Sequence, residues 1–444
     1  MPDSTPPSVS VSLTRTGYFA VLSTWYPETC YNSDSSLYSH MRADDHSRQK
    51  YYVAFLMNGA KPPRGAEYLT LDLITHLRKD TFYPIVIYIE EGEIVSKIKK
   101  AGIKTIRVPL SKKITSFYPR EAGVSNPVFI ISFLWHLLKS GIIIKVIKVL
   151  RTNKIQLIYC SDNLSKLIGG ICGKITGIKV VAHCHDIFSE KSLYHGSIRI
   201  IMKPVYLLFL SKIIAVSERA RKYFTLGSKV SQKVITIYNG IDTKRYDPDK
   251  IDTSLKKEFE ISEEDLTIGS IGTLDQNKGQ KYLIEAIERL KADGITNIAC
   301  LICGTGEDEK YLKELVREKN LTKEVLFLGF RKDIPRVLRI LDIMVMTSFA
   351  ESFSMSIVEA MAMEVPVIGT NVGGIPEVVD DGKTGIIVPP GNIDALCEAI
   401  KYLIQNPGIR FQMGKNGRVK VLEKFTIEEN VRKTEDVFLS LMVT

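Results

Sequence analysis

Short apolar runs of strand length alternate with segments of helical period from about residue 51 onward. In the first half of the chain the expected strands are 52–57, 84–89, 105–108, 156–160, 179–184 and 213–216. The expected helices between them include 67–78, 93–101, 127–151 and 164–176. Strands that are apolar on both faces are buried on both faces, so this alternation predicts a parallel sheet covered by helices on each side.

The same alternation restarts after residue 240. The expected strands are 267–272, 298–303, 325–328, 343–347, 365–369 and 385–388, and the expected helices include 280–291, 309–318, 354–363 and 394–405. Two halves of this kind predict an α/β protein with two Rossmann-like, doubly wound domains facing each other across a cleft.

The pattern also sets the expected domain boundaries. Residues 1–50 are rich in Ser, Pro, Tyr and Asp without a sustained period, and we expect a poorly ordered extension. We expect an N-terminal domain over 51–240 and a C-terminal domain over 241–426. Residues 427–444 are expected to form a helix that packs back on the N-terminal domain.

Composition agrees with a soluble, two-domain protein. The chain has 444 residues, of which 45% are hydrophobic and 25% charged. Residues 1–20 lack the continuous apolar region of a signal peptide. The most apolar region, 128–150, is interrupted by His136 and three lysines, so we expect no transmembrane helix and a cytoplasmic location.

The net charge of +10 is concentrated in one stretch of the first half. Residues 122–217 hold twelve lysines and arginines against three acidic residues. Such a surface attracts phosphates, although an ordinary solvated face is an equal alternative. The helices expected at 127–151 and 198–210 mix apolar and basic residues, which suits docking on an anionic membrane; packing of their apolar sides into the core is the alternative. No nucleic-acid recognition motif is present, so nucleic-acid binding is not expected.

Cysteine and histidine spacing does not favour a metal. Cys300 and Cys303 lie in a strand-like run, where alternation turns their thiols to opposite faces. The seven cysteines are therefore expected to be mostly buried thiols in a reducing cytoplasm. His183 and His185 share one strand face without a third ligand nearby, and no acidic DxD cluster lies at a strand end, so neither a metal nor a cofactor is expected.

The densest candidate chemistry lies in residues 347–362, where a strand ends, a loop follows and a helix starts near Ser354. Ligands of open α/β sheets bind at the carboxyl ends of strands, and a helix start with Ser354 and Ser356 attracts an anion such as a diphosphate. Glu359, about a turn and a half into the helix, could accept hydrogen bonds from a ribose diol. Glu351 could do so for sugar hydroxyls. Taken alone, the two glutamates would more simply be solvated surface residues.

The order of motifs resembles glycosyltransferase family 4, retaining enzymes of the GT-B fold that move a sugar from a nucleotide donor. The matching residues are Glu351, Phe353, Glu359, the Ala-Met-Ala of 360–362, and the segments 366–369, 373–377 and 381–385. The resemblance runs from about residue 51 to residue 426.

By this resemblance Glu359 binds the donor ribose and Glu351 contacts the transferred sugar. The backbone amides of Phe353, Ser354, Met355 and Ser356 would hold the diphosphate. The family often has Gly where this chain has Ser352 and Ser354, which leaves the identity of the donor sugar open.

Five further residues on other loops correspond to family positions. Lys278 lies before a helix, where it can neutralise phosphate oxygens, although a lysine in solvent is the default for an isolated Lys-Gly. The resemblance implies that Thr273 replaces an arginine on the diphosphate and that Gly304 lies beside the nucleotide base. It also implies that His185 reaches the donor sugar and that Gly65 lets the backbone approach the donor phosphate.

The expected activity is therefore a retaining hexosyl transfer from a UDP- or GDP-sugar to a glycan or lipid-linked acceptor, in polysaccharide or glycolipid biosynthesis. His185, Glu351 and Lys278 are the expected catalytic residues, and we expect a cytoplasmic protein with a peripheral contact on the inner face of the membrane. Two alternatives stay open. One is a nucleotide-sugar epimerase of the same fold; the other is a catalytically silent scaffold that binds nucleotide.

Overall fold

The computed structural model describes residues 50–59, 65–110, 127–185, 208–225 and 231–442. The expected N-terminal extension, except for Lys50, and the helix expected at 198–210, except for its last residues, lie outside these ranges. Within them the expected strand–helix alternation is present in both halves of the chain.

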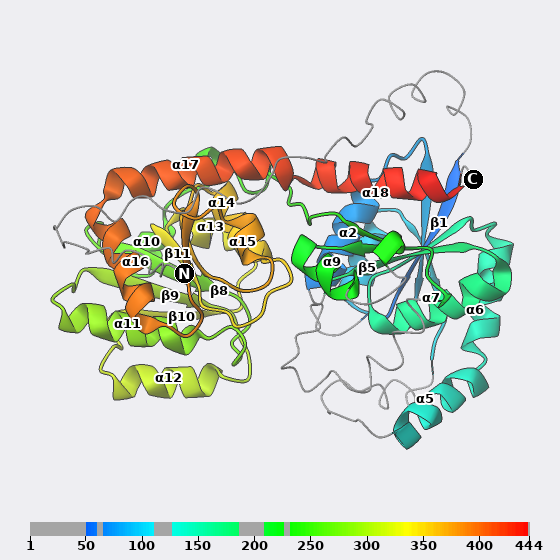
Figure 1. Cartoon of the computed structure of the whole chain (residues 1–444), viewed down its shortest axis with the longest axis horizontal. Coiled ribbons are helices and arrows are strands. Elements are labelled where there is room, and N and C mark those ends of the chain that lie inside the picture. The colour runs from blue at the N-terminus through cyan, green and yellow to red at the C-terminus, as the bar shows by residue number, and fades with distance from the viewer. Residues whose placement is uncertain (1–49, 60–64, 111–126, 186–207, 226–230, 443–444) are drawn as a thin grey trace, which may run out of the picture. The chain divides into compact units, whose positions relative to one another are not determined.

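Seven strands of the first half form one parallel sheet in the order β3-β2-β1-β4-β5-β6-β7. Figure 1 labels two of them, β1 and β5. Their bounds are β1 Tyr51–Met57, β2 Phe82–Tyr88, β3 Lys104–Arg107, β4 Leu157–Cys160, β5 Lys179–Cys184, β6 Lys212–Ala215 and β7 Val234–Thr236. The last of these was not predicted, because a run of three residues is too short to show a period.

Alternate residues of each strand feed two different cores. Ala54 and Leu56 of β1 face the core made with α5, α6 and α7, whereas Val53 and Phe55 face the core made with α2, α3 and α18. The helix bounds are α2 Gly65–His76, α3 Glu93–Lys100, α5 Pro127–Lys139, α6 Ile142–Thr152, α7 Asn163–Thr176, α9 Glu218–Thr225 and α18 Ile427–Met442. Helices on both faces of a parallel sheet give the Rossmann-like arrangement predicted from the sequence.

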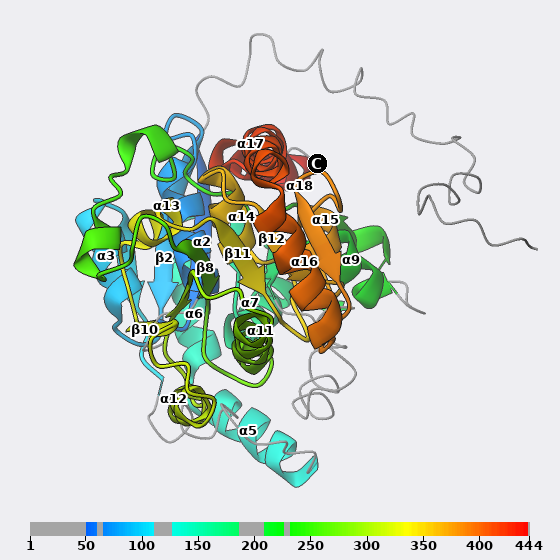
Figure 2. The ribbon, with the colours of Figure 1, turned by 90° about the vertical axis from the view of Figure 1, so that its left-hand side faces the viewer.

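The second half repeats this design with six strands in the order β10-β9-β8-β11-β12-β13, again all parallel. Their bounds are β8 Leu266–Ile271, β9 Ile298–Cys303, β10 Val325–Gly329, β11 Ile343–Met346, β12 Val367–Thr370 and β13 Gly385–Val388. The helices are α10 Leu255–Glu258, α11 Gln280–Ala292, α12 Glu309–Glu318, α13 Ile334–Arg339, α14 Met355–Ala362, α15 Ile375–Val378, α16 Ile393–Gln405 and α17 Pro407–Lys424. Helices α11 and α16 lie side by side on one face of this sheet, with α13, α14 and α17 contributing to the core on the other (Figure 2).

One helix expected from the sequence is two. The segment 127–151 was predicted as a single helix, but it breaks into α5 and α6 at Ser140 and Gly141. Gly141 has φ of 67°, a left-handed conformation that ends a helix and that glycine adopts without strain. The Ser140 hydroxyl supports the break, since it donates to the Leu137 carbonyl and accepts from the Ile142 amide.

The final helix packs on the first sheet. Phe438 of α18 is completely buried, and its ring lies 5.9 Å from that of Phe82 and 5.9 Å from that of Tyr159. Glu435 receives hydrogen bonds from the backbone amide and the Nε of Arg78, at 2.7 Å and 2.6 Å. The chain therefore completes the core of its first sheet with residues that follow the second sheet.

The strand orders locate the expected binding edges. In the first sheet the order in which successive strands are added reverses between β1 and β4, and in the second it reverses between β8 and β11. At such a reversal the loops after the two neighbouring strands diverge and leave room for a ligand at their carboxyl ends. The loops that follow β8 and β11 carry Lys278 and Glu351.

Two expectations about the whole chain can be compared with the described residues. No helix among them is both long and apolar enough to cross a membrane, and they contain no cluster of metal-binding side chains. All six cysteines of the described ranges are buried free thiols. Burial raises the pKa of the Cys300 thiol to about 12, so this group stays protonated at neutral pH.

Candidate active site

Lys278 and Glu351 meet at the reversal point of the second sheet. The Lys278 ammonium forms an ion pair with the Glu351 carboxylate, and the Ser348 hydroxyl donates to the same carboxylate at 3.1 Å. The Lys278 side chain retains 21% of its exposure and Glu351 retains 10%, so the pair is accessible without being freely solvated. The structure thus brings together two predicted catalytic residues that lie far apart in the sequence.

Hydrogen bonds lock the two loops that carry this pair. The Thr347 hydroxyl lies 2.8 Å from the Gly279 carbonyl and 3.0 Å from the Lys278 carbonyl. The Phe349 amide donates to the Asn277 carbonyl at 2.7 Å, and the Asn277 side-chain amide donates to the Ala350 carbonyl at 2.9 Å. Hydrogen bonds donated from each loop to the backbone of the other hold the loops in register, which limits how far Lys278 can move from Glu351.

Two glycines hold the Glu351 loop from the other side. A Cβ added to Gly373 would lie 1.6 Å from the Glu351 carbonyl oxygen, and one added to Gly374 would lie 2.4 Å from that of Ser352. The Gly374 amide donates to the Glu351 carbonyl at 2.9 Å. The double glycine of the sequence motif is therefore required by the close approach of two backbones.

The start of α14 lies directly after this loop. Ser354 is the N-cap residue, and its side chain makes no capping hydrogen bond. The first amides of a helix have no intrahelical acceptor, so those of Met355 and Ser356 point out of the helix start as free donors. Their partial positive charge, together with Lys278 nearby in the adjoining loop, suits an anionic group such as a diphosphate.

Phe353 points into the protein. Its ring is buried and stacks on Tyr238 at 5.8 Å with an interplanar angle of 30°, and it meets Phe425 edge-on at 5.5 Å. The side chain therefore anchors the loop, and only its backbone is left to contact a ligand. Sequence spacing identified the position but could not show whether the ring contacts a ligand or packs into the protein.

Glu359 has a partner that the sequence did not reveal. The Tyr246 hydroxyl donates to its carboxylate at 2.7 Å. Burial raises the pKa of Glu359 to about 7, against the opposing effects of the Tyr246 hydrogen bond and the Arg245 charge. Tyr246 lies 113 residues away and follows no recognisable motif, so only the tertiary structure could identify it.

The two remaining positions of this sheet edge differ in exposure. Thr273 is exposed, and its carbonyl accepts a hydrogen bond from the Gln280 side chain at 2.8 Å. Gly304 has φ of 145°, and an added Cβ would lie 1.8 Å from the Gly272 carbonyl oxygen. Gly304 is thus fixed by the packing of the loops after β8 and β9, whereas the Thr273 side chain is open to a ligand.

At the first sheet, Gly65 and His185 lie on separate segments that follow β1 and β5. Gly65 begins α2 and is exposed, with open space where a side chain would be. His185 follows β5, and within the described residues its two ring nitrogens are buried without a hydrogen-bond partner. Burial, His183 and the buried Lys166 hold the pKa of His185 well below its usual range, so the imidazole is neutral and carries an N–H donor for which the described residues offer no acceptor.

His183 has a structural environment, in line with its interpretation from the sequence. Its Nδ1 lies 2.5 Å from the Tyr159 hydroxyl, and its ring lies 4.1 Å from that of His185. Burial and the Lys166 charge lower the pKa of His183 to about 3. Asp186, which follows His185 in the motif, lies outside the described residues.

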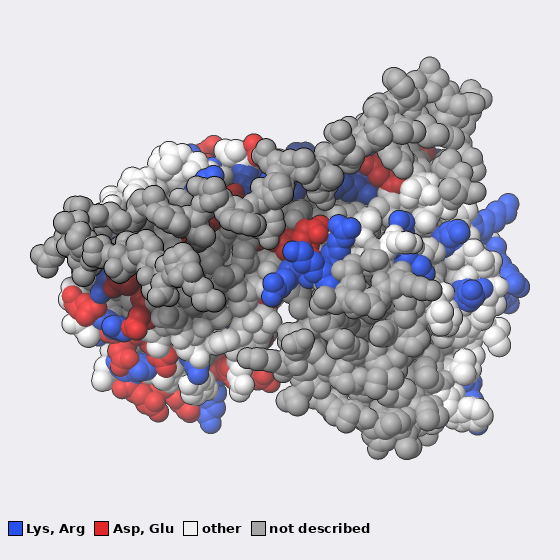
Figure 3. All heavy atoms as spheres, in the orientation of Figure 1, with Lys and Arg blue, Asp and Glu red and all other residues white. Residues whose placement is uncertain are grey.

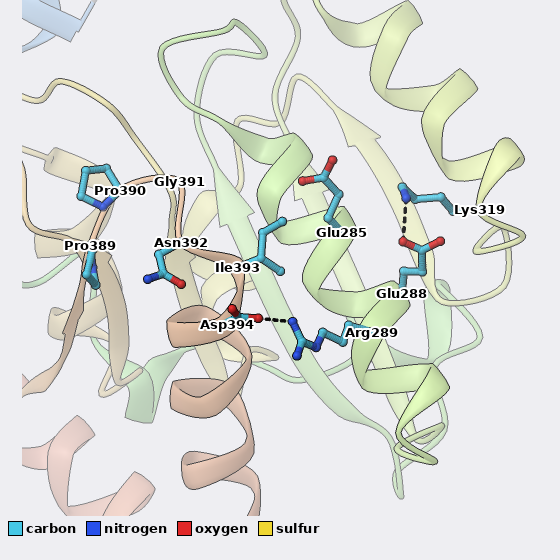
Figure 4. Close-up of a pocket in the computed structure, with 10 residues that line it drawn as sticks. All are labelled: Glu285, Glu288, Arg289, Lys319, Pro389, Pro390, Gly391, Asn392, Ile393 and Asp394. Atoms are coloured by element: carbon cyan, nitrogen blue, oxygen red, sulfur yellow. Dashed lines mark hydrogen bonds and ion pairs between the residues drawn. The ribbon is translucent and has the colours of Figure 1, made fainter.

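A surface groove elsewhere on the second domain contains none of the predicted site residues (Figure 4). It lies between α11 and the start of α16. The two cations drawn there already have partners: Arg289 pairs with Asp394, and Lys319 pairs with Glu288 at 2.6 Å. A Cβ added to Gly391, which lines the groove, would lie 3.5 Å from the Phe349 ring and 3.8 Å from the Tyr282 ring.

Two family models match the chain. The model described as Glycosyltransferase Family 4 matches residues 63–245, and the model described as Glycosyl transferases group 1 matches residues 252–420. The first match includes β2 to β7 but not β1, and the second includes β8 to β13; α18 lies outside both.

Individual relatives match over different shares of their length. The chain is 30% identical over 214 residues to the N-acetyl-alpha-D-glucosaminyl L-malate synthase of Bacillus anthracis, which covers 48% of this chain and 55% of that relative. It is 24% identical over 310 residues to the UDP-Gal:alpha-D-GlcNAc-diphosphoundecaprenol alpha-1,3-galactosyltransferase of Escherichia coli. That match covers 68% of this chain and 79% of the relative. The structure of Anabaena Alr3699/HepE in complex with UDP superposes with a TM-score of 0.74 at 22% identity, covering 88% of this chain and 100% of that one. This last likeness confirms the predicted fold of two Rossmann-like domains.

Proposed function

We propose that this chain, both halves of which match glycosyltransferase family models, is a retaining glycosyltransferase that uses a nucleotide-diphosphate sugar. The models and the named relatives support a glycosyltransferase of the family 4 type in glycan or glycolipid biosynthesis. The observation that carries the finer proposal is the Lys278–Glu351 ion pair, placed at the reversal point of the second sheet and directly before the free amides of α14.

The proposed chemistry follows from the groups at that edge. In the reaction the bond from the sugar's anomeric carbon to the diphosphate oxygen breaks, and a bond to the acceptor oxygen forms on the same face. The acceptor's hydroxyl proton passes to the leaving diphosphate. Lys278 and the amides of Met355 and Ser356 stabilise the charge that develops on the diphosphate. Glu351 then accepts hydrogen bonds from the transferred sugar.

The other predicted residues complete the donor site in this proposal. Glu359 binds the ribose, and the exposed Thr273 contacts the diphosphate. His185 presents its unused N–H to the sugar from the first sheet, and Gly65 lies beside the donor phosphate. The donor is a UDP- or GDP-sugar, and no metal or resident cofactor is invoked. Solved structures of similar fold hold UDP and UDP-glucose.

The acceptor is proposed to be a glycan or a lipid-linked saccharide that the first domain binds at an anionic membrane surface. One relative is named for an acceptor linked to diphosphoundecaprenol. Basic side chains gather at the edge of the first domain over α6 (Figure 3). They belong to a surface formed by exposed residues of α5 and α6: Trp135, Leu138, Lys139, Ile144, Lys145, Lys148 and Arg151.

The decisive experiment measures nucleotide release from a panel of UDP- and GDP-sugars, with and without a polyprenyl-diphosphate saccharide acceptor. A transferase releases nucleotide fastest when the acceptor is present. A nucleotide-sugar epimerase releases nucleotide without it, and a silent scaffold releases none. Either of these last two results would overturn the proposal.

Substitutions of Lys278 and Glu351 then test whether the reaction takes place at the proposed site. We expect Lys278→Ala and Glu351→Ala each to lower kcat by about 100- to 1,000-fold, since each removes a charged contact made at the reaction centre. Lys310→Ala is the control, because its side chain is 89% exposed on α12 away from the site. Circular dichroism should show all three variants folded; near-wild-type turnover in Lys278→Ala or Glu351→Ala would contradict the assignment.

A further inference from the structure

The amino end of α9 is capped by a carboxylate from the other domain. Helix α9 follows β6 of the first sheet, whereas Glu377 lies on α15, between β12 and β13 of the second. One oxygen of Glu377 accepts from the Glu218 amide at 2.8 Å, and the other accepts from the Arg219 amide at 2.7 Å. The Ser217 hydroxyl accepts from the next free amide, that of Ala220, at 3.1 Å. The first turn of α9 is thus satisfied only with Glu377 in place.

This contact is favourable for two physical reasons. The first amides of a helix have no intrahelical acceptor and carry the positive end of the helix dipole. Hydrogen bonds from amides to a carboxylate are stronger than those between neutral groups. Removal of Glu377 would leave the Glu218 and Arg219 amides without these acceptors and would weaken the attachment of α9 to α15.

The same short helix holds the Glu351 loop. Helix α15 begins directly after Gly374, whose amide donates to the Glu351 carbonyl at 2.9 Å. Gly373 and Gly374 leave no room for a side chain against this loop. A displacement of α15 must therefore displace the backbone of Glu351, because the two are in direct contact.

Tyr238 makes a second connection between Glu377 and the site. Its hydroxyl donates to Glu377 at 3.1 Å, and its ring stacks on Phe353 at 5.8 Å. Its backbone carbonyl accepts from the Asn430 side chain at 2.7 Å, which ties it to α18 as well. Glu377 is thus joined to the Glu351 loop through α15 and, independently, through the Tyr238–Phe353 stack.

We propose that Glu377 is a positioning residue: by capping α9 it holds the loop of Glu351 in register with the first domain, where the acceptor binds. This inference rests on the proposed function. It predicts a specific kinetic signature. Of the proposed donor contacts, Lys278, Glu359 and the amides of α14 belong to the second domain, whereas Gly65 and His185 belong to the first. We therefore expect nucleotide binding to depend much less on the Glu377 contact than sugar transfer does. Alignment of the transferred sugar with the acceptor does need it, and a misplacement of about 1 Å can cost about 100-fold in rate.

The test compares Glu377→Ala and Glu377→Gln with a matched control, Glu435→Gln. Glu435 also receives two hydrogen bonds, from Arg78, but it joins α18 to the first sheet and does not contact the Glu351 loop. We expect Glu377→Ala to lower kcat for transfer by about 10- to 100-fold, with the donor KM and the UDP affinity from titration calorimetry within about threefold of wild type. Glu377→Gln, which keeps one acceptor oxygen, should lose less, and Glu435→Gln should keep its kcat despite a lower melting temperature.

The outcomes separate this inference from the function on which it rests. If wild type transfers sugar and Glu377→Ala transfers it equally fast, the positioning role is wrong while the proposed function stands. The role is equally wrong if Glu435→Gln loses as much kcat as Glu377→Ala, since general destabilisation would then explain both. A wild type that transfers sugar from no nucleotide sugar overturns the proposed function and this inference together.

Discussion

The carboxyl group of Glu359 links burial to the pH dependence of donor binding. Because its pKa is raised to about 7, it is protonated below that pH and ionised above it. The ionised form accepts hydrogen bonds well with both oxygens, as a ribose diol requires, whereas in the protonated form one oxygen carries a hydrogen and becomes a donor. We therefore expect the affinity for a UDP-sugar to fall as the pH is lowered from 8 to 6, with a midpoint near 7.

Titration calorimetry with a UDP-sugar checks this, because the diphosphate of a UDP-sugar does not itself titrate in that range. Glu359→Gln should bind weakly at every pH between 6 and 8, without the midpoint. Glu423→Gln, an exposed residue of α17, should behave as wild type. A wild-type affinity that is constant across this range would show that Glu359 does not titrate there or does not contact the donor.

Single residues were predictable where a motif fixes their place on a loop. Lys278 and Glu351 were placed after two different strands, and the structure joins them in an ion pair. The pairing itself depends on β8 and β11 being neighbours in the sheet, which neither motif encodes. Tyr246 and Tyr238 were missed because their partners come from tertiary contacts between distant segments, and a lone tyrosine has no signature in a sequence.

At the scale of elements, helices α5 and α6 carry exposed apolar side chains beside exposed cations. Phe133, Leu137 and the inner side of α6 pack into the core, which agrees with the plainer of the two interpretations from the sequence. Trp135 and Leu138, however, are 56% and 60% exposed, and the Lys139 ammonium lies 4.6 Å from the Trp135 ring centroid. Exposed aromatic and aliphatic groups beside lysines are suited to the headgroup region of an anionic membrane.

Sedimentation with vesicles tests this surface. We expect wild type to bind phosphatidylglycerol vesicles at low salt and phosphatidylcholine vesicles much more weakly. The double substitution of Trp135→Ser and Leu138→Ser should reduce binding by about tenfold or more, because it removes apolar groups that would insert. Ile175→Ser on α7 is the matched control, since Ile175 is an equally exposed apolar residue of the same domain. Equal binding of both vesicle types, or no effect of the double substitution, would refute membrane docking by α5.

Elements long enough to repeat a clear apolar period were predictable, and very short elements were not. Strand β5 and helix α12 were predicted with the bounds that the structure has, because each has a clear apolar pattern. Strand β7, with three residues, and helix α15, with four, are too short to show a period. The break between α5 and α6 was missed because apolar residues continue through it and only Gly141 marks it.

Considered as a whole, the molecule uses its last helix to finish its first core. Phe438 fills a site between Phe55, Phe82 and Tyr159, so a smaller side chain there leaves a cavity. We expect Phe438→Ala to lower the free energy of unfolding by about 3–5 kcal/mol. Denaturant unfolding followed by circular dichroism measures this, with Leu422→Ala, at 47% exposure on α17, as the control. A loss no greater than that of the control would mean that α18 contributes little to the first domain.

The general plan of two parallel, doubly wound sheets was predictable from strand–helix alternation alone. The path of the chain between them was harder to predict, because α17 belongs to the core of the second sheet and α18 to that of the first. The helical period of α18 shows that it needs an apolar partner but not which sheet provides it. The pocket that receives Phe438 shows that the partner is the first sheet. This pocket exists only once the first sheet has formed.

The return of α18 also has a consequence for how the protein is made. A ribosome releases the strands of the first sheet well before residues 427–442, and at about 5–20 residues per second the delay is on the order of ten seconds or more. During that interval the apolar groove over Phe55 and Phe82 has no cover. The nascent first domain should therefore be a client of chaperones until α18 has left the ribosome, and any change that delays the docking of α18 would lengthen that dependence.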